Sequence, residues 1–430
     1  MDKEPLKHIH LHDTFLWKQG DKIFKKIFLL GRWIVMAMIS GLVVGAFATL
    51  FAKSMNFVTN LRTQNPYIIL ALPLAGIVIV GIYRLTNSTD NRGTNLVISS
   101  ISSQDDIPFK MAPLIFISTV LTHLCGGSAG REGAALQLGG SIGNFIGKIF
   151  KIDDNDRKVI IMCGMSAAFS ALFGTPMAAS IFSIEVVSVG VMYYSALVPC
   201  IVASLVASGF ASDMSIRPVH FTIINKPEFT LPNAGKTVVL ALICAAVSVL
   251  FCLAMKYISI TYKKYLKNGY VRVVAASFII VGLSALLQTT DYLGAGVDVI
   301  NRAISGEADN FAFLLKILFT ALTLGAGFKG GEIVPSFFIG ATLGCVFGGL
   351  AGLSPSLCAA IGMVSVFCGV TNCPISSLLI SFELFGDNVK AYFLIAIAIS
   401  YMMSGYYSLY HDQKIIYSKS KTKYINIKAK

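Results

Sequence analysis

The sequence predicts an all-α membrane protein, built as a bundle of unequal, broken and tilted helices from two repeats of inverted topology. Three features predict this: the composition, the lengths of the apolar stretches, and a glycine pattern that occurs twice. Of the 430 residues, 55% are hydrophobic and 13% are charged, about half the charge of a typical soluble domain. The mean hydropathy is +0.71. Most of the surface must therefore face lipid.

The apolar stretches fall into two classes of length. Four long ones are close to the roughly 20 residues that cross a bilayer, and they lie near residues 33–52, 67–83, 238–255 and 273–287. Shorter ones, interrupted by glycine or proline, lie near residues 111–124, 134–150, 176–191, 311–325, 335–350 and 374–385. Helices that end inside a membrane are tolerated only where their ends line a polar cavity within the protein. We therefore expect broken helices around such a cavity.

Lysine and arginine residues determine the expected orientation. They outnumber the acidic residues and give a net charge of +13. They gather in hydrophilic segments beside the apolar stretches. A nucleic-acid-binding protein would instead have a basic face with interleaved aromatic residues, so this distribution argues against nucleic-acid binding. Basic residues beside membrane spans stay in the cytoplasm. We expect a cell-membrane protein with both termini and the loop at 263–267 in the cytoplasm. The expected division is a cytoplasmic segment 1–31, one transmembrane domain 32–410, a basic cytoplasmic tail 411–430 and no C-terminal regulatory domain.

A repeat divides the transmembrane domain into halves near 32–210 and 235–410. Four glycines of the first half match four of the second at one constant offset: Gly130, Gly139, Gly143 and Gly147 against Gly331, Gly340, Gly344 and Gly348. Pro176 precedes Glu185 by the spacing that separates Pro374 from Glu383. Two halves with interrupted helices at matching positions are typical of transporters that bind their ligand at the membrane midplane.

The glycine-rich segments 126–133 and 325–331 each precede an apolar helix. Glycine lets backbone N–H groups approach a ligand, and a helix start adds amide donors and a partial positive charge. Two such starts at the midplane would bind a small anion without the full charge of a lysine. The alternative is that these glycines only allow close helix packing.

Glu132 lies inside the first glycine-rich start. An ionisable side chain in a membrane segment indicates function by default. An ionised carboxylate beside an anion site competes for that site, and a protonated one leaves it, so Glu132 can couple anion movement to protons. The alternative is a structural pair with Arg131.

Several motifs resemble the CLC family of chloride channels and proton-coupled anion exchangers. They are Gly130-Arg131-Glu132-Gly133 with Gln137, Phe173-Gly-Thr-Pro176 through Glu185, Gly330-Gly-Glu-Ile-Val-Pro335, and Ser408-Leu409-Tyr410. The resemblance implies a homodimer with one pore in each subunit, Glu132 as the external gating carboxylate and Tyr410 as an anion-coordinating hydroxyl. The anion-binding residues that we infer with it are Gly93, Thr94, Asn95, Gly130, Arg131, Gly133, Ile333, Val334, Phe337, Phe338 and Tyr410.

Three departures from the chloride-transporting members favour one branch. In the stretch that matches the family's first anion-binding motif, Thr94 follows Gly93 where the family has a serine, and the motif's proline is missing. Val186 stands where the exchangers have a second glutamate. Glu332 stands where the chloride-transporting members have an apolar residue. Together these departures resemble the fluoride–proton antiporters of the family. Glu332 then belongs to a second proton or water path; the alternative is an acid stabilised by the helix dipole.

Fluoride is small and strongly hydrated, so its site must replace many hydrogen bonds. Phe337 and Phe338 could offer positive ring edges to the anion, or they could be packing residues. The expected partners are fluoride, or chloride, with protons and the lipid bilayer. A chloride channel or chloride–proton exchanger is the alternative within the family.

An intramembrane enzyme or a receptor subunit is the alternative from another class. An enzyme would need a nucleophile beside a base, or a metal cluster. His123 is the one histidine in an apolar segment before the basic tail, and no Asp or Cys is placed to join it. The nine cysteines are scattered through apolar segments, so we expect neither a metal nor another cofactor.

Overall fold

The protein is described from a computed structural model that covers residues 8–88, 92–103 and 105–430, with side chains from Lys22 onward. Its helices range from 8 residues in α11 to 57 in α1. The α-helices of the described residues are α1 (His8–Gln64), α2 (Leu72–Leu85), α3 (Thr94–Ser103), α4 (Met111–Leu124), α5 (Glu132–Ile149), α6 (Asp154–Phe173), α7 (Pro176–Glu185), α8 (Leu197–Asp213), α9 (Leu231–Tyr265), α10 (Gly269–Leu287), α11 (Val297–Ile304), α12 (Ala312–Ala326), α13 (Ile333–Ala351), α14 (Pro355–Thr371), α15 (Pro374–Phe385) and α16 (Lys390–Met403). The short 3₁₀ helices are η1 (Pro66–Ala71) and η2 (Tyr194–Ala196), and the strands are β1 (Ser188–Val189), β2 (Lys414–Tyr417) and β3 (Tyr424–Lys428).

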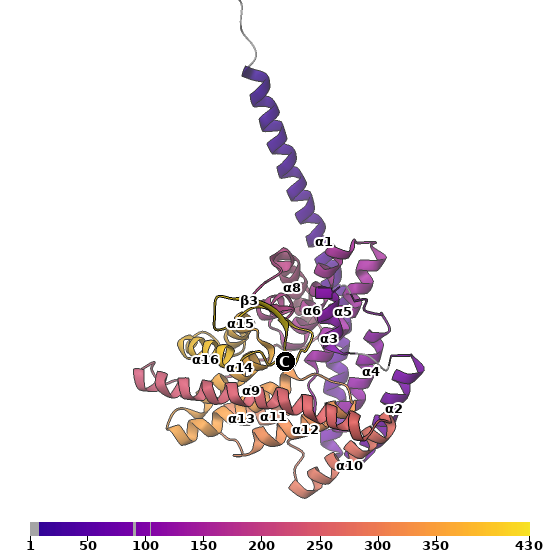
Figure 1. The fold of residues 1–430 in the computed structure, drawn as a ribbon, viewed down its shortest axis with the longest axis vertical. Coiled ribbons are helices and arrows are strands. Elements are labelled where there is room, and N and C mark those ends of the chain that lie inside the picture. Colours follow the sequence, from indigo (N-terminus) through magenta and orange to yellow (C-terminus); the bar gives the residue numbers. More distant parts are fainter. Residues whose placement is uncertain (1–7, 89–91, 104) are drawn as a thin grey trace, which may run out of the picture.

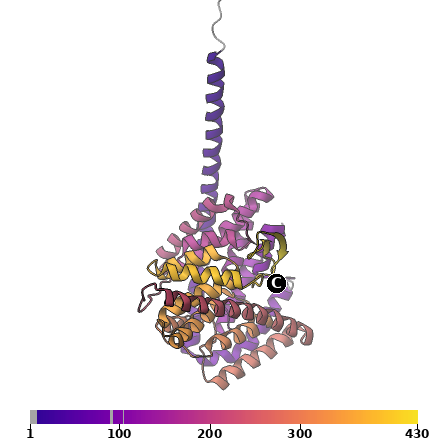
Figure 2. The same cartoon turned by 60° about the vertical axis from the view of Figure 1, so that its left-hand side comes forward.

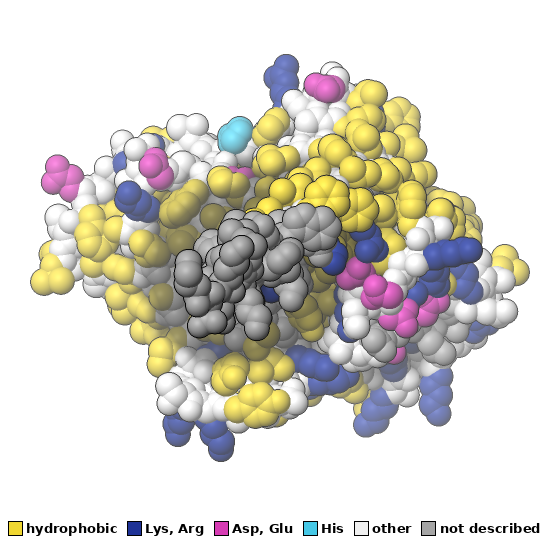
Figure 3. Space-filling view, turned by 90° about the horizontal axis from the view of Figure 1, so that it is seen from above, with side chains coloured by type: hydrophobic (Ala, Val, Ile, Leu, Met, Phe, Trp, Pro, Cys, Tyr) yellow, Lys and Arg dark blue, Asp and Glu magenta, His cyan; other side chains and the backbone are white. Residues whose placement is uncertain are grey.

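The helices are unequal in length, as the apolar stretches predict. Six helical segments in the described chain are long and apolar enough to cross a membrane, and they contain α1, α2, α8, α9, α10 and α13. Others have only 10–17 residues, too few to span a bilayer alone. Two of these, α4 and α15, coincide with the predicted short stretches. Large apolar side chains cover wide areas of the molecule in Figure 3, and such a surface fits lipid rather than water.

The first helix is longer than its apolar stretch. α1 runs unbroken past residue 31, where we expected the N-terminal segment to give way to the transmembrane domain. The helix contains no proline, so no backbone hydrogen bond is lost along it. Its N-terminal part projects from the bundle as a single rod in both views (Figures 1 and 2).

Four of the repeated glycines serve close helix packing. A Cβ added at Gly139 in α5 would lie 2.1 Å from the carbonyl oxygen of Gly164 in α6. In the other half, a Cβ at Gly340 in α13 would lie 2.2 Å from the carbonyl oxygen of Gly362 in α14. Gly143 and Gly344 meet the neighbouring helix in the same way. Both halves therefore contain the same tightly packed helix pair.

The repeated proline-to-glutamate spacing produces a reciprocal pair of helix caps. Glu185, at the end of α7, accepts the N–H groups of Ile375 (3.1 Å) and Ser376 (2.8 Å) at the start of α15. Glu383, in the last turn of α15, accepts the N–H groups of Met177 (2.9 Å) and Ala178 (2.8 Å) at the start of α7. Each carboxylate thus satisfies amides that a helix start leaves unpaired. The repeat joins the two halves through this antiparallel pair.

The basic tail forms a hairpin against the bundle. β2 pairs with β3 antiparallel and with β1, the short strand after α7, in parallel. Asp412 accepts hydrogen bonds from Lys428 (2.6 Å) and Arg92 (3.3 Å), and Arg92 also binds Asp105 (2.5 Å). The bond from Arg92 lowers the pKa of Asp105 below its usual value. The hairpin therefore packs beside α3, near one of the predicted anion motifs.

Candidate functional site

The two glycine-rich helix starts meet inside the bundle. Gly130 and Gly331 exchange both backbone hydrogen bonds, each N–H donating to the carbonyl oxygen of the other at 2.7 Å. α5 begins at Glu132 and α13 at Ile333, so this contact brings the starts of both helices together. A Cβ on Gly331 would lie 2.4 Å from the backbone nitrogen of Gly133. Glycine is therefore required for the approach, which joins matching positions of the two repeats.

The first turns of α5 and α13 carry backbone amides of the kind that bind anions. The first N–H groups of a helix have no acceptor within it, and they carry a partial positive charge. Ile333 and Val334 begin α13, and Gly133 is the second residue of α5; all three are buried. Two helix starts that meet away from water can bind an anion through amides alone.

The carboxylate of Glu132 folds back onto this junction. Its Oε2 accepts the backbone N–H of Arg131 at 2.9 Å, and its Oε1 accepts Arg131 Nε at 3.3 Å. Glu132 is 1% exposed, and Oε2 would lie 2.9 Å from a Cβ on Gly130. The pair with Arg131 that we considered as the alternative is present. The same carboxylate also lies at a helix start where an anion would bind, so the two interpretations are compatible.

Thr94 lies against the opposite side of the start of α5. Its hydroxyl donates to the carbonyl oxygen of Gly133 at 3.3 Å and accepts Gln137 Nε2 at 3.1 Å. The preceding Gly93 has a φ of +62°, a left-handed conformation that favours glycine. Asn95 also lines the cavity beside Thr94, and its Oδ1 accepts the backbone N–H of Asp412 at 3.1 Å. Thr94 therefore contacts the junction directly, whereas Asn95 holds the C-terminal segment beside it.

A cavity of about 800 Å³ leads to this junction, and we call it the inner cavity because Lys428 and Lys430 of the basic tail line it. Its wall contains Thr94, Gln137, Gly330, Glu332 and Tyr410. Within the described chain, three buried oxygens of this wall have no hydrogen-bond partner: Gln137 Oε1, Glu332 Oε2 and Tyr410 Oη. Buried polar atoms normally find a partner, and where the protein supplies none they bind water or a ligand. Glu332 and Tyr410, which the sequence analysis identified separately, thus line the same cavity as Thr94.

Glu332 makes no capping bond to the first turn of α13, although it is the residue before that helix. Its Oε2 would instead lie 3.2 Å from a Cβ on Gly133, across the junction. The carboxylate therefore points toward the start of the opposite helix.

The two phenylalanines of α13 have different surroundings. Phe337 packs in an aromatic cluster, with ring centroids 5.1 Å from Phe367 and 5.8 Å from Phe173. Phe338 lies under the ammonium group of Lys316, whose Nζ is 5.0 Å from the ring centroid. Neither ring lines the inner cavity. These contacts favour the packing interpretation for Phe337.

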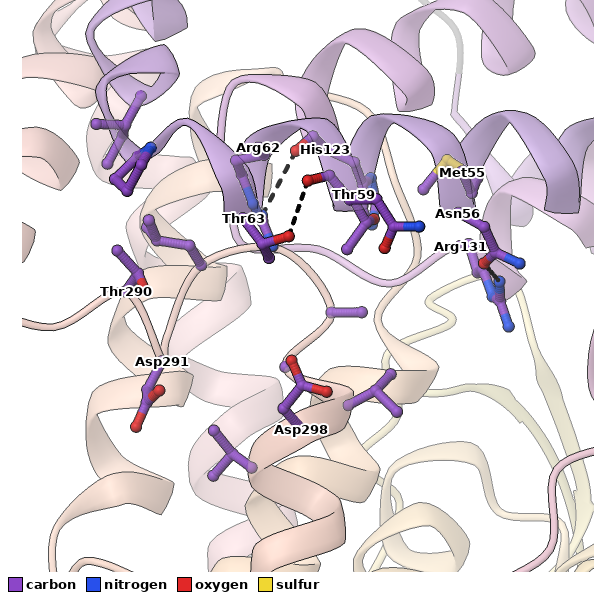
Figure 4. A pocket seen from close by; sticks show the side chains of 18 residues that line it. Met55, Asn56, Thr59, Arg62, Thr63, His123, Arg131, Thr290, Asp291 and Asp298 are labelled. Atoms are coloured by element: carbon purple, nitrogen blue, oxygen red, sulfur yellow. Dashed lines mark hydrogen bonds between the residues drawn. The ribbon is translucent and has the colours of Figure 1, made fainter.

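A second cavity, of about 460 Å³, is lined by Arg131, and we call it the outer cavity. Figure 4 shows Arg62 and Arg131 along one wall and Asp291 and Asp298 along the facing one. Arg131 Nη1 also donates to Asn56 at 3.2 Å, which ties the start of α5 to α1. Glu132 therefore bonds to a residue of the outer wall, while its neighbour Gly133 contacts Thr94 of the inner one.

Val186, where we noted a missing second glutamate, is buried beside the C-terminal segment. Its carbonyl oxygen accepts Gln413 Nε2 at 3.0 Å, and the same amide nitrogen donates to the carbonyl oxygen of Thr371 at 2.8 Å. This position is occupied by packed side chains and satisfied amides.

Sequence reasoning missed three polar residues near the site: Gln137 as a cavity residue, Lys316 and Lys329. Gln137 was noted only as part of a motif. Lys316 is fully buried in α12, where its ammonium donates to the carbonyl oxygens of Gly294 (2.7 Å) and Tyr292 (3.2 Å). A single charge inside an otherwise apolar stretch is a signal that could have identified it.

Broken helices that meet at buried glycines, between an inner and an outer cavity, define a membrane protein with a transport path for a small ligand. The chain belongs to the CLC family: the family model described as "Voltage gated chloride channel" matches residues 75–405.

Known proteins are similar to this one over nearly the whole chain. A chloride/fluoride channel protein of Pseudomonas syringae pathovar tomato is 33% identical over 91% of this chain and 88% of its own length. The crystal structure of a CLC-type fluoride/proton antiporter is also 33% identical, with a TM-score of 0.87 over 90% of this chain and 99% of that one. A slow cyanobacterial Cl⁻/H⁺ antiporter has a TM-score of 0.77 at 17% identity, over 87% of this chain and 94% of that one, and it supports the fold. The predicted family and all-α fold are confirmed, and the names of these relatives describe channels and transporters.

Proposed function

We propose that this protein exports a small halide in exchange for protons, and that the halide is fluoride. One observation carries the coupling: the Glu132 carboxylate is folded onto the helix start at the Gly130–Gly331 junction. A carboxylate oxygen there takes the place that an anion would take. Because both groups are negative, the anion and the ionised carboxylate exclude each other.

Protonation makes the exchange reversible. A neutral carboxyl loses its attraction to the helix start and to Arg131, so it leaves and the anion enters. When the anion departs, the carboxyl releases its proton and returns. Arg131 lines the outer cavity, so Glu132 accepts its proton from the outer side, and the proton leaves to the inner side by way of Glu332, which lines the inner cavity. Each cycle thus moves an anion and a proton in opposite directions.

Fluoride is favoured by residues around the inner cavity. Glu332 supplies a second carboxylate where chloride-transporting members have an apolar residue, and Val186 lacks the carboxylate of the chloride exchangers. Thr94 is fixed by Gln137 and the Gly133 carbonyl oxygen. The similar proteins whose names include fluoride add support. We assign the anion-binding role to the first-turn amides of α5 and α13, with Gly93, Thr94 and Tyr410 beside them.

The proposal includes a setting and an assembly. The protein lies in the cell membrane with both termini in the cytoplasm, because basic residues flank them. It works as a homodimer with one transport path in each subunit. Exposed apolar side chains on the neighbouring helices α7, α8, α15 and α16 fit such an interface, among them Met177, Leu205, Ile375 and Leu394.

Purified protein in liposomes tests the function. With fluoride and chloride offered at equal concentrations, we expect fluoride flux to exceed chloride flux by at least about tenfold, which corresponds to roughly 1.4 kcal/mol in barrier height. A fluoride gradient should also drive protons uphill in the opposite direction. Equal fluxes would refute the choice of fluoride, and flux without proton movement would indicate a channel. Cells that lack the gene should tolerate external fluoride less well, most of all at acid pH.

A further inference from the structure

Lys329 is a cation in the wall of the inner cavity, and no acid of the described residues pairs with it. It precedes Gly330 in the segment between α12 and α13, and its side chain is partly buried. Its Nζ lies 4.5 Å from the ring centroid of Tyr83. Among the described residues it forms no ion pair, whereas Lys428 and Arg92 at the rim of the same cavity both pair with Asp412. A partly buried charge without a counter-charge is costly, so an anion that enters the cavity would stabilise it.

The repeat shows that this loop does not need a charge to fold. The offset that matches Gly130 to Gly331 also matches Ser128 to Lys329. Ser128 is buried, its hydroxyl lies 3.0 Å from that of Thr320, and its N–H donates to Thr323 Oγ1 at 3.1 Å. A neutral, fully bonded side chain therefore serves in the other half. The lysine is confined to the side of the junction that faces the inner cavity.

The surroundings of Lys329 favour anions. Lys256 and Lys263 line the same cavity, and within the described part of the chain neither forms an ion pair. The acids of the cavity wall are Glu332, at the junction itself, and Asp412, which is engaged by two cations. Such a basic cavity with low-dielectric walls raises the local concentration of anions.

We propose that Lys329 forms an anion-binding position that takes a hydrated halide from the cytoplasm before it reaches the helix starts at Gly331. The ammonium attracts the anion from the cavity, and the amides of α13 then replace its water. Since the cavity is open to solvent, the attraction is weak enough for the anion to move on. This inference rests on the proposed function, because it assumes anion transport through the junction.

A single cysteine variant can test the charge without changing the fold between measurements. The nine native cysteines are buried, but Cys252 lines the same cavity, so the cysteine at position 329 is introduced into a Cys252→Ser background and modified in inside-out membrane vesicles. An aminoethyl methanethiosulfonate adds an ammonium group, and a sulfonatoethyl methanethiosulfonate adds an anion to the same variant. The initial rate of uptake is measured against the concentration of fluoride, and separately of chloride, on the cytoplasmic face.

We expect Lys329→Cys to raise the half-saturating fluoride concentration at least about fivefold, with the maximal rate within about twofold of the parent protein. Attaching the ammonium group should restore the half-saturating fluoride concentration of the parent protein, and attaching the sulfonate should raise this concentration further. Lys264→Cys is the control, because Lys264 is exposed on the same end of α9 but outside the cavity wall; neither reagent should affect it.

The proposal would be overturned if the half-saturating fluoride concentration did not depend on the sign of the attached charge. It would also be overturned if only the maximal rate changed. If the parent protein carries chloride but not fluoride, with the same dependence on charge, the role of Lys329 stands and the choice of fluoride falls. If neither anion is carried, both proposals fall.

Discussion

At the scale of single residues, the Glu132 carboxylate lies at the contact between the two helix starts. Its carboxylate bonds to the backbone and side chain of Arg131 and lies against Gly130. No other described acid is placed so close to the Gly130–Gly331 contact on the outer side. In the proposed mechanism, removing the charge removes the competitor for the anion while leaving the two helix starts in place.

We expect Glu132→Gln to abolish proton movement driven by a fluoride gradient, because the amide cannot carry the proton. Passive fluoride flux should persist, since the helix-start amides remain. The measurement is proton uptake and fluoride flux in the same liposomes. Glu228→Gln, an exposed change of the same type, should leave both unaltered, and normal proton coupling in Glu132→Gln would exclude the role.

Thr94 determines how the inner side of the junction is held. Its branched side chain restricts the rotamer and directs the hydroxyl to Gly133 and Gln137. Thr94→Ser keeps the hydroxyl but loses this restriction, so we expect the ratio of fluoride to chloride flux to fall by about threefold or more. Thr261→Ser, on an exposed part of α9, is the matched control. An unchanged ratio in Thr94→Ser would argue against this hydroxyl as a determinant of selectivity.

At the scale of elements, the fold depends on contacts that only glycine permits. The contact between Gly130 and Gly331 differs from the glycine contacts of α5 with α6 and of α13 with α14, because it joins two helix starts rather than two helix faces. The sequence pattern is the same in both cases. The distinction between packing and ligand binding appears only once the neighbours of each glycine are known.

We expect Gly331→Ala to abolish anion flux, because its Cβ would lie 2.4 Å from the backbone nitrogen of Gly133 and would force the helix starts apart. The strain of overpacking is typically about 1–3 kcal/mol. Flux and the apparent unfolding temperature are measured together. Gly349→Ala, where a Cβ meets nothing within 4 Å, should keep both values, and a fully active Gly331→Ala protein would contradict the close approach.

The reciprocal caps between α7 and α15 are expected to stabilise the fold. Glu383→Gln replaces a charged acceptor of two N–H groups, and such bonds contribute about 1.5–3 kcal/mol each before screening. Because Glu383 is only partly buried, we expect a net loss of about 1 kcal/mol. This should appear as a lower unfolding temperature in detergent. An unchanged temperature would mean that water replaces the cap at no cost.

At the scale of the whole molecule, the cavities give the path two different entrances. The inner one is bordered by Lys256, Lys263 and Lys329, whereas the outer one carries both arginines and aspartates (Figure 4). The C-terminal hairpin belongs to the inner side, since Ala429 and Lys430 line that cavity. The hairpin therefore places the basic tail at the inner cavity.

The topology prediction rests on the basic residues at both ends of the chain. Single cysteines at positions 5 and 425, in a background without native cysteines, should resist a membrane-impermeant thiol reagent applied to intact cells. The same positions should react in inside-out vesicles, which serves as the control for accessibility. Ready labelling of either position from outside the cell would reverse the proposed orientation.

The sequence by itself determined the class of fold, the family and the two helix starts. Hydrophobicity and helix length are local properties, so the apolar stretches anticipated α4 and α15 over their full length. The glycine offset and the proline-to-glutamate spacing also lie in the chain itself, and they predicted that Gly130 and Gly331 occupy matching places. Glu132 was identified because a charge in a membrane segment is rare.

Only the tertiary structure decided what each repeated residue contacts. It assigned Gly139 and Gly340 to packing, Glu185 and Glu383 to mutual capping, and Asn95 to the C-terminal segment rather than to the junction. The physical reason is that hydrogen bonds and close contacts between distant segments depend on how the two halves dock. Docking of the halves gives Glu185 a partner that follows almost 200 residues later. It also creates the cavity in which Lys329 has no acidic partner among the described residues. Neither feature leaves a periodic signal in the sequence.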